Sequence, residues 1–353
     1  MKILHTADIH LRELNDERWK TLRELIAIGQ KEKIDVLAIS GDLFDKGIDA
    51  ERLRPRIREL FSKTGFRILV IPGNHDESSL EAGLYFGEDA IILNDTTPQD
   101  FGNIKIIGIP YESVESEEVF NKIQSIKPSL TEDTTNILMY HGELLDMFFS
   151  REDLGDEGQK RYMPIKASYL DDLKIDYVLA GHFHTRFDSM KLANCGWFIY
   201  PGSPVSITKA ETGQRKANLL TIGKPPNEYP LDTFHYEKVV IEFDPFIQRN
   251  LFELVNDTFQ KLHPQAKILL TFDGYINSKQ IGISETQLRE QLIALVKGKC
   301  VEEPSYHVSD IKKILDDDLF QSFRQKVEEG NYDENQKKKM LRVAIQAMME
   351  ALA

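Results

Sequence analysis

Five short blocks in the first half of the chain hold the residues that could do chemistry. They are Asp8-Ile9-His10, Gly41-Asp42-Leu43-Phe44-Asp45, Gly73-Asn74-His75-Asp76, His141-Gly142-Glu143 and Gly181-His182-Phe183-His184. Aspartate, histidine and asparagine together suit manganese, iron or zinc better than magnesium or calcium, which favour cages made of oxygen alone. The blocks therefore predict a site for divalent metal ions, with Mn(II) as the first choice and iron, zinc or magnesium as alternatives.

The predicted ligands follow apolar segments that have the character of β-strands. These segments cover residues 2–6, 36–40, 68–71, 137–140 and 177–180. Ligand sites of α/β sheets lie at the carboxyl ends of the strands, so we expect each block to lie at the carboxyl end of its strand. Asp8 and His10 are two residues apart, as are His182 and His184, and in an extended chain each pair would project to one side. Asp42 offers two carboxylate oxygens and is suited to bridge two cations.

Each block taken alone has an ordinary structural explanation. A single aspartate or histidine after a strand is more often a turn or cap residue than a metal ligand. Because five blocks with suitable residue types occur in the expected order, coincidence is the weaker explanation for the whole set.

The alternation of strand and helix patterns predicts an α/β fold for the first part of the chain. Amphipathic helix candidates at 16–31 and 50–63 separate the first strands, which is typical of βαβ units in a largely parallel sheet. Later strand candidates at 104–109, 197–200 and 217–222 have few helices between them, so we expect a second, mixed sheet packed on the first. A proline-rich linker follows, and the first domain is predicted to span residues 1–232.

Two smaller segments are predicted after the linker. A β-α-β-α pattern indicates a small α/β domain at residues 233–303, and a charged, helical segment is expected at 304–353. The apolar residues of that last segment recur at near-helical spacing: Ile311, Ile314, Leu315, Phe320, Phe323 and Val327. An apolar stripe of this kind needs a cover, either from a partner protein or from the small domain of the same chain.

Composition narrows the possible classes of protein. The chain has 353 residues and a formal net charge of -13, which argues against binding nucleic acid through a basic surface that extends over the whole molecule. Cys195 and Cys300 are too far apart for a C-x-x-C motif, so neither a disulfide framework nor a thiolate zinc site is indicated. The sequence has no signal-peptide pattern and no apolar stretch near the roughly 20 residues that span a bilayer, so we expect a cytoplasmic protein.

The motifs D-x-H, G-D-x-x-D, G-N-H-D, H-G and G-H-x-H, between residues 8 and 184, together resemble those of calcineurin-like metallophosphoesterases. The resemblance implies a four-layer αββα sandwich with a dimetal centre. It also implies two ligand sets that share Asp42: Asp8, His10, Asp42 and His184 for one metal, and Asp42, Asn74, His141 and His182 for the other. Two such cations activate a water for in-line attack on phosphorus, so no side-chain nucleophile is needed.

The same resemblance implies roles for residues beside the ligands. His75 is expected to contact the scissile phosphate and assist the leaving group, and the Asp45 side chain to orient His75. A turn or cap carboxylate is the alternative explanation for Asp45. Asp76 is expected to support its loop.

Residues 3–11 and 200–204, together with the small domain, resemble the DNA-repair nuclease branch of this superfamily, typified by SbcD. That resemblance implies a DNA exonuclease or endonuclease, a C-terminal segment that docks on an SMC-like coiled-coil ABC ATPase (SbcC-like), and a possible homodimer. Asp45 departs from the pattern, because these nucleases commonly carry histidine there. A small-molecule or nucleotide phosphodiesterase or phosphatase, and a non-catalytic scaffold on the same fold, are therefore alternatives.

Basic residues near the metal blocks in sequence are candidates for DNA contact. They are Arg12, Lys46, Arg151, Lys160, Arg161, Arg186, Lys209, Arg215 and Lys216. Single lysines and arginines on a surface are usually just solvated, so the path of DNA is not predicted from these positions.

Overall fold

The computed structural model describes residues 1–76, 79–114, 116–147, 162–194, 196–246 and 249–352. The chain divides into two compact units, Met1–Tyr236 and Glu237–Ala353, which are described separately below. Among the described residues, no helix has both the length and the apolar character needed to cross a membrane.

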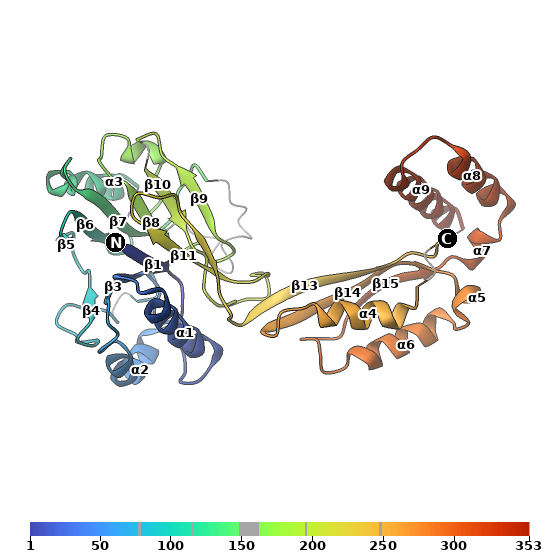
Figure 1. Cartoon of the computed structure of the whole chain (residues 1–353), viewed down its shortest axis with the longest axis horizontal. Helices are drawn as coiled ribbons and strands as arrows, with labels where there is room; N and C mark the ends of the chain where they lie inside the picture. The colour runs from blue at the N-terminus through green and yellow to red at the C-terminus, as the bar shows by residue number, and fades with distance from the viewer. Residues whose placement is uncertain (77–78, 115, 148–161, 195, 247–248, 353) are drawn as a thin grey trace. The chain divides into compact units, whose positions relative to one another are not determined.

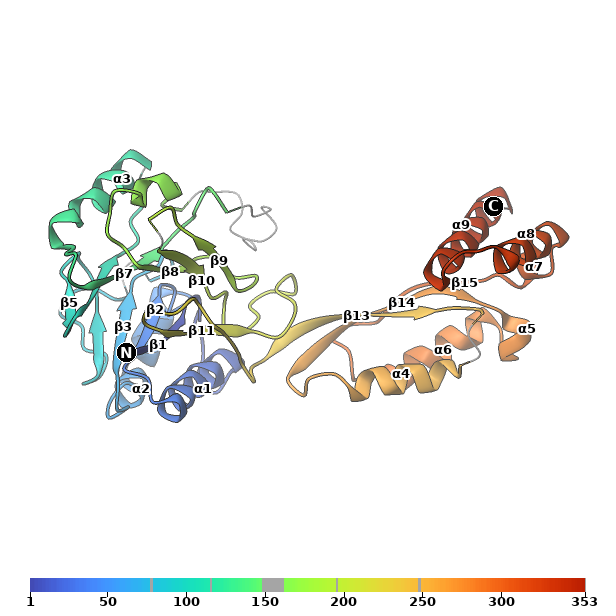
Figure 2. The same ribbon diagram turned by 45° about the horizontal axis from the view of Figure 1, so that its top comes forward.

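The first unit contains two six-stranded sheets (Figures 1 and 2). The first has the order β12-β11-β1-β2-β3-β4, formed by Glu228–Pro230, Lys216–Thr221, Lys2–Thr6, Val36–Ser40, Arg67–Ile71 and Ala90–Ile92. The second has the order β5-β6-β7-β8-β10-β9, formed by Gln99–Phe101, Ile104–Ile109, Thr135–His141, Tyr177–Gly181, Trp197–Tyr200 and Asp188–Lys191. Strands β1 to β4 are parallel, as are β6, β7, β8 and β10, so each sheet collects several strand ends at one edge.

Alternating side chains of these strands build a four-layer αββα sandwich, as predicted. Ile3, Val36 and Leu69 of the first sheet pack against Ile106 and Met139 of the second, in a core between the sheets. The intervening residues point outward and form two further cores under the helices. Helices α1 (Glu17–Glu32) and α2 (Gly47–Leu60) cover the first sheet, and α3 (Ser116–Ser125) with the short 3₁₀ helices η1 (Lys127–Ser129) and η3 (Ala167–Leu170) lies on the second (Figure 1).

The second unit is built on a three-stranded sheet of order β13-β14-β15. Its strands are His235–Phe243, Ala266–Ile276 and Ser305–Asp310. Helices α4 (Leu251–Gln260) and α6 (Glu285–Val296) pack on Ile268, Leu270 and Phe272 of β14, and the short α5 (Ser278–Ile281) follows β14. The expectation of a helical segment directly after Pro304 was wrong, because residues 305–310 pair in parallel with β14. In this mostly polar strand only Tyr306 and Val308 are apolar residues at alternate positions, so the sequence pattern for a strand is weak. The segment is a strand because it pairs with β14.

The C-terminal helices α7 (Lys312–Leu315), α8 (Asp318–Glu329) and α9 (Glu334–Leu352) form a separate core in the second unit. The residues of the predicted stripe are buried in this core, except Phe323, which is partly buried. They pack against Leu341 and Ile345 of α9 and beside Phe246 and Tyr275. An ion pair of 3.3 Å between Lys338 and Asp244 also ties α9 to this unit. The stripe is therefore covered within the chain, by α9 together with Phe246 and Tyr275 of the small domain, whereas only the small domain was predicted as a cover from the same chain.

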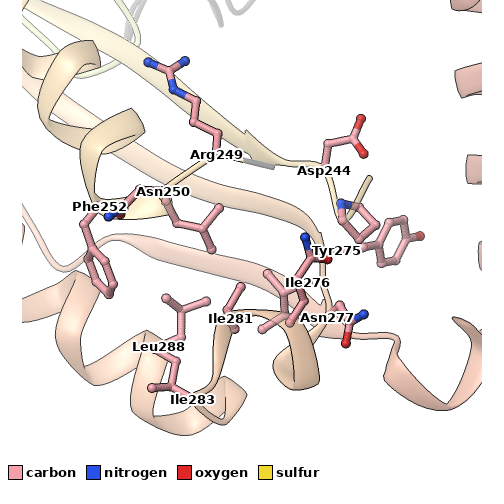
Figure 3. A pocket seen from close by; sticks show the side chains of 13 residues that line it. Asp244, Arg249, Asn250, Phe252, Tyr275, Ile276, Asn277, Ile281, Ile283 and Leu288 are labelled. Atoms are coloured by element: carbon pink, nitrogen blue, oxygen red, sulfur yellow. The ribbon is translucent and has the colours of Figure 1, made fainter. Parts of the chain in front are cut away.

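A pocket of about 300 Å³ lies in the second unit, where the end of β14 meets α4 to α6 (Figure 3). Its lining mixes charged side chains such as Asp244 and Arg249 with apolar ones such as Phe252 and Leu288. None of the predicted metal ligands lines it.

Candidate metal centre

The predicted ligands lie on the loops that follow β1, β2, β3 and β8, and on the last residue of β7. Hydrogen bonds join these loops: the Asp8 N–H donates to the Gly41 carbonyl at 3.0 Å, and the His182 N–H donates to the Asp8 carboxylate at 3.1 Å. Gly41 has a φ of +93°, and a Cβ at this position would lie only 2.0 Å from Nδ1 of His141. The glycine therefore lets the loop after β2 approach the ligand from β7 closely.

Several ligands have left-handed backbone conformations. The φ angles of Asp8, His10, Asp42 and His182 are 56°, 50°, 53° and 92°. The expectation that Asp8 and His10 project from an extended chain was wrong, because β1 ends at Thr6 and the loop then turns over the sheet edge. Such conformations cost about 1–3 kcal/mol each and concentrate at functional sites, where the surrounding structure maintains them.

The first group of donor atoms comes from Asp8, His10, Asp42 and His184. One ligand atom from each lies within 4.8 Å of the others, and all four residues are buried. The two Nε2 atoms of His10 and His184 are 3.4 Å apart, and His184 Nε2 is 3.7 Å from Asp8 Oδ1. Two imidazole nitrogens and two carboxylates that converge in this way are suited to share one cation.

The second group of donors adjoins the first through Asp42. Nε2 of His141 is 2.9 Å from Oδ1 of Asn74 and 3.4 Å from Oδ2 of Asp42. The ring of His182 lies beside that of His141, with 5.4 Å between the ring centroids. Asp42 Oδ2 is also 3.7 Å from His10 Nε2, so a single carboxylate oxygen faces both groups.

The surroundings of Asp42 show that the donor set fits divalent metal ions. Its Oδ1 accepts a hydrogen bond of 2.9 Å from the His75 N–H, whereas its Oδ2 is buried and has no hydrogen-bond partner. A buried carboxylate oxygen without a donor is costly, and a cation between the two groups would supply the missing partner. Asp8, His10, Asp42, Asn74, His141, His182 and His184 are the residues that could hold such ions.

Burial and mutual charges shift the pKa values of these groups. Burial raises the pKa of Asp8 to about 6, although His184 and His141 act in the opposite direction. Burial lowers the pKa of His10 to about 3. Burial also works to lower the pKa of His141, but the negative charge of Asp42 outweighs it and raises this pKa to about 10. His141 and Asp42 therefore form a buried ion pair in the metal-free protein.

The outer ring nitrogens of the histidines contact groups behind the metal site. Nδ1 of His141 donates to the Ser40 carbonyl at 2.8 Å. Nδ1 of His184 lies 3.5 Å from Oε1 of Glu211. We did not predict Glu211 from the sequence, where it is an isolated glutamate after the segment 200–204. His10, His141 and His184 thus present Nε2 to the donor groups, and His141 and His184 have an oxygen within 3.5 Å of Nδ1.

His75 lies beside the first group and contacts residue 45, but not in the predicted way. Nδ1 of His75 lies 3.0 Å from the main-chain carbonyl of Asp45, which can only accept, so this nitrogen carries the proton. The Asp45 side chain forms ion pairs with Arg12 at 2.9 Å and Arg18 at 3.0 Å. Burial works to raise the pKa of Asp45, but these two arginines hold it below its usual value. The structure therefore gives the orienting contact to the main chain of residue 45, where the resemblance implied the side chain.

Asp76 supports its loop, as expected. Its carboxylate accepts hydrogen bonds from the main-chain N–H groups of Leu43, Phe44 and Gly73, at 3.0, 2.9 and 3.2 Å. These bonds hold the Asp42 loop against the Asn74 loop.

The basic residues proposed for DNA contact have different environments. Arg215 is 3% exposed and donates to main-chain carbonyls, so it is not a surface group. Lys216 pairs with Glu228, and Arg186 with Asp188 at 3.7 Å. Lys46, Arg186 and Lys209 are exposed. Arg151, Lys160 and Arg161 lie outside the described residues, as does Cys195.

The αββα sandwich and the donor groups at the strand ends of both sheets define a metal-dependent phosphoester hydrolase. The chain belongs to the Calcineurin-like phosphoesterase family, whose sequence profile matches residues 1–186. It is 24% identical over 336 residues to YhaO of Bacillus subtilis (strain 168), described as an uncharacterized metallophosphoesterase, with coverage of 86% of this chain and 79% of YhaO.

The chain is also 29% identical over 208 residues to the DNA double-strand break repair protein Mre11 of Sulfurisphaera tokodaii. That match covers 52% of this chain and 49% of Mre11. Among solved structures, a dimetal phosphatase from Danio rerio has a TM-score of 0.41 and 11% identity, covering 63% of this chain and 93% of that protein.

Proposed function

We propose that this protein is a manganese-dependent DNA nuclease that acts in DNA repair. The observation that carries the proposal is the pair of donor groups around Asp42 Oδ2, with the ring of His75 4.7 Å from that of His10. This arrangement suits hydrolysis of a phosphodiester bond. The similarity to Mre11, a DNA double-strand break repair protein, supports DNA as the substrate.

In this proposal the seven ligands would hold two ions, and Asp42 would contribute to both donor groups. When bound, the ions supply an activated water and bind the phosphate oxygens. The protein's own contribution is to position groups around them. The main-chain N–H of His75 donates to the Asp42 carboxylate, and the main-chain carbonyl of Asp45 accepts from Nδ1 of the His75 ring. Nε2 of His75 is then the ring atom that can donate a proton to the leaving oxygen, if the imidazole is protonated.

The nuclease branch commonly carries histidine where this chain has Asp45, but the structure makes this difference less important for the proposed function. The contact that orients His75 comes from a main-chain carbonyl, which any residue at position 45 would provide. The Asp45 carboxylate instead pairs with Arg12 and Arg18. A change of side chain at this position therefore leaves the contact to His75 in place.

A nucleotide phosphodiesterase is the second candidate, and two tyrosines near the ligands suit a nucleotide as well as DNA. The ring of Tyr162 is 4.7 Å from that of His182, and the ring of Tyr111 is 6.4 Å from that of His141. Aromatic faces stack on nucleobases, and they do so in nucleic acids and in free nucleotides alike. A non-catalytic scaffold agrees less well with a full set of seven potential ligands.

We also propose that an SMC-like coiled-coil ABC ATPase binds the C-terminal helices, and that the protein can form a homodimer. The predicted apolar stripe no longer supports the ATPase contact, since it is buried. Leu319 of α8 and Val343 of α9, which are 74% and 60% exposed, are the remaining apolar candidates for this contact.

Comparison of substrates under the same metal conditions tests the proposed function. Manganese-loaded protein should cleave linear duplex or single-stranded DNA and bis-p-nitrophenyl phosphate, and act on cyclic nucleotides much more slowly. Preference for cyclic nucleotides would favour the second candidate. Hydrolysis of none of these substrates by metal-loaded protein would support a scaffold.

A further inference from the structure

Residues 201–215, which follow β10, fold back against the loop that carries His184. The Ser203 N–H donates to the His184 carbonyl at 3.0 Å, and the buried Arg215 guanidinium donates to the carbonyls of Thr185 at 2.8 Å and Ser203 at 2.9 Å. Gly202 has a φ of +72°, and a Cβ there would lie 3.1 Å from the His184 carbonyl oxygen. The main chain around His184 is therefore held by a segment that contributes no metal ligand.

Glu211 is the side chain of this segment that faces the ring of His184. It is 1% exposed, and its Oε1 lies 3.5 Å from His184 Nδ1. Its Oε2 accepts hydrogen bonds from the Ile207 N–H at 2.7 Å and the Ser203 hydroxyl at 3.1 Å, and Oε1 accepts one from Thr208 at 3.2 Å. The carboxylate thus has a fixed position and keeps one oxygen toward the imidazole.

We propose that Glu211 is a positioning residue of the metal centre. It holds the proton of His184 on Nδ1 and the ring in the orientation that turns Nε2 toward Asp8 and His10. This inference rests on the metal centre of the proposed function and adds a residue to it. An imidazole can flip about its Cβ–Cγ bond, and the acceptor behind it decides which nitrogen faces a metal.

The comparison with His141 supports this role. That ring uses the Ser40 carbonyl behind Nδ1 and presents Nε2 to Asn74 and Asp42. Both histidines thus have an oxygen behind the ring, but the oxygen behind His184 belongs to a carboxylate. A carboxylate behind a ligand also makes the imidazole a stronger donor to a metal, so its loss is expected to weaken binding.

The variant Glu211→Gln tests the proposal, with Glu228→Gln as the matched control on the exposed strand β12. Manganese binding to the full chain is measured by calorimetric titration without substrate. We expect one of the two ions to bind about 10–100-fold more weakly in Glu211→Gln, and Glu228→Gln to bind both as the wild type does. The melting temperature of the metal-free protein is measured in parallel.

Equal affinities in Glu211→Gln and the wild type would overturn the proposal. Equal weakening at both ions together with a large fall in the melting temperature would also overturn it, because it would indicate a structural role. If the wild type binds no manganese, the metal centre itself fails, which is a different result from a loss confined to the variant.

A second measurement does not depend on how the variant folds. In zinc-loaded wild-type protein with ¹⁵N-labelled histidine, two-bond correlations identify the protonated nitrogen of His184, assigned by its absence in His184→Gln. Protonation at Nδ1 with slow solvent exchange supports the proposal. Protonation at Nε2, or rapid exchange at Nδ1, overturns it.

Discussion

Metal binding should strengthen as the pH rises, because a proton on His141 competes with the cation. In the metal-free protein Asp42 raises the pKa of His141 to about 10, well above the ordinary value of 6.5. The ion pair stabilises the fold fully below pH 6.5, and this contribution is lost as the pH rises through about 10. At neutral pH a metal ion must therefore displace the proton in order to use Nε2.

The size of the effect can be worked out from the same shift. At pH 7 the pKa of about 10 lies roughly 3 units higher, and each unit corresponds to about 1.36 kcal/mol. Displacing the proton then costs about 4 kcal/mol at pH 7 and about 1 kcal/mol at pH 9. The affinity of one ion should thus rise about tenfold per pH unit over this range. Below about pH 6 the dependence should steepen, since Asp8, with a pKa of about 6, then also holds a proton.

Calorimetric titration with manganese in buffers of different ionisation enthalpy measures this directly. We expect close to one proton to be released between pH 7 and 8.5 for the ion that uses His141, and more below pH 6. A pH-independent affinity with no proton release between pH 7 and 8.5 would refute the buried ion pair. Asp42→Asn is not a suitable control here, because it removes a ligand as well as the partner of His141.

Four further variants test other parts of the metal centre and the second unit. Asp42→Asn should abolish binding of both ions, because Oδ2 faces both donor groups, and one ion retained in elemental analysis would show that Asp42 is not the bridge. His75→Ala should keep both metals but lose about 10²–10⁴-fold in DNA cleavage, and near-normal turnover would remove His75 from the mechanism. Phe320→Ala should destabilise the second unit by about 3–5 kcal/mol in denaturant unfolding while the metal content is unchanged; a smaller loss would mean that the C-terminal core does not depend on this ring. The double change Leu319→Asp and Val343→Asp should leave the fold intact by circular dichroism and prevent capture of an SMC-like ATPase, and continued capture would place that contact elsewhere.

Features that depend on neighbours along the chain could be predicted from the sequence. The strands before each ligand block, the helices at 17–32 and 47–60 and the second sheet follow from hydrophobic periodicity and turn residues, which are local properties. The identities of the candidate ligands could also be predicted, because each block combines metal-binding residue types with the end of a strand.

Features that depend on contacts between distant parts of the chain needed the tertiary structure. Glu211 acts on His184 only because residues 201–215 fold back, and the Asp45 side chain turns to Arg12 and Arg18 rather than to His75. Similarly, residues 305–310 become a strand because β14 offers a free edge, and the C-terminal stripe is buried because α9 and Tyr275 reach it. Periodicity reports which face of an element is apolar. It does not show which distant residues will pack on that face or which groups will form hydrogen bonds with a side chain. Those contacts depend on how the whole unit packs.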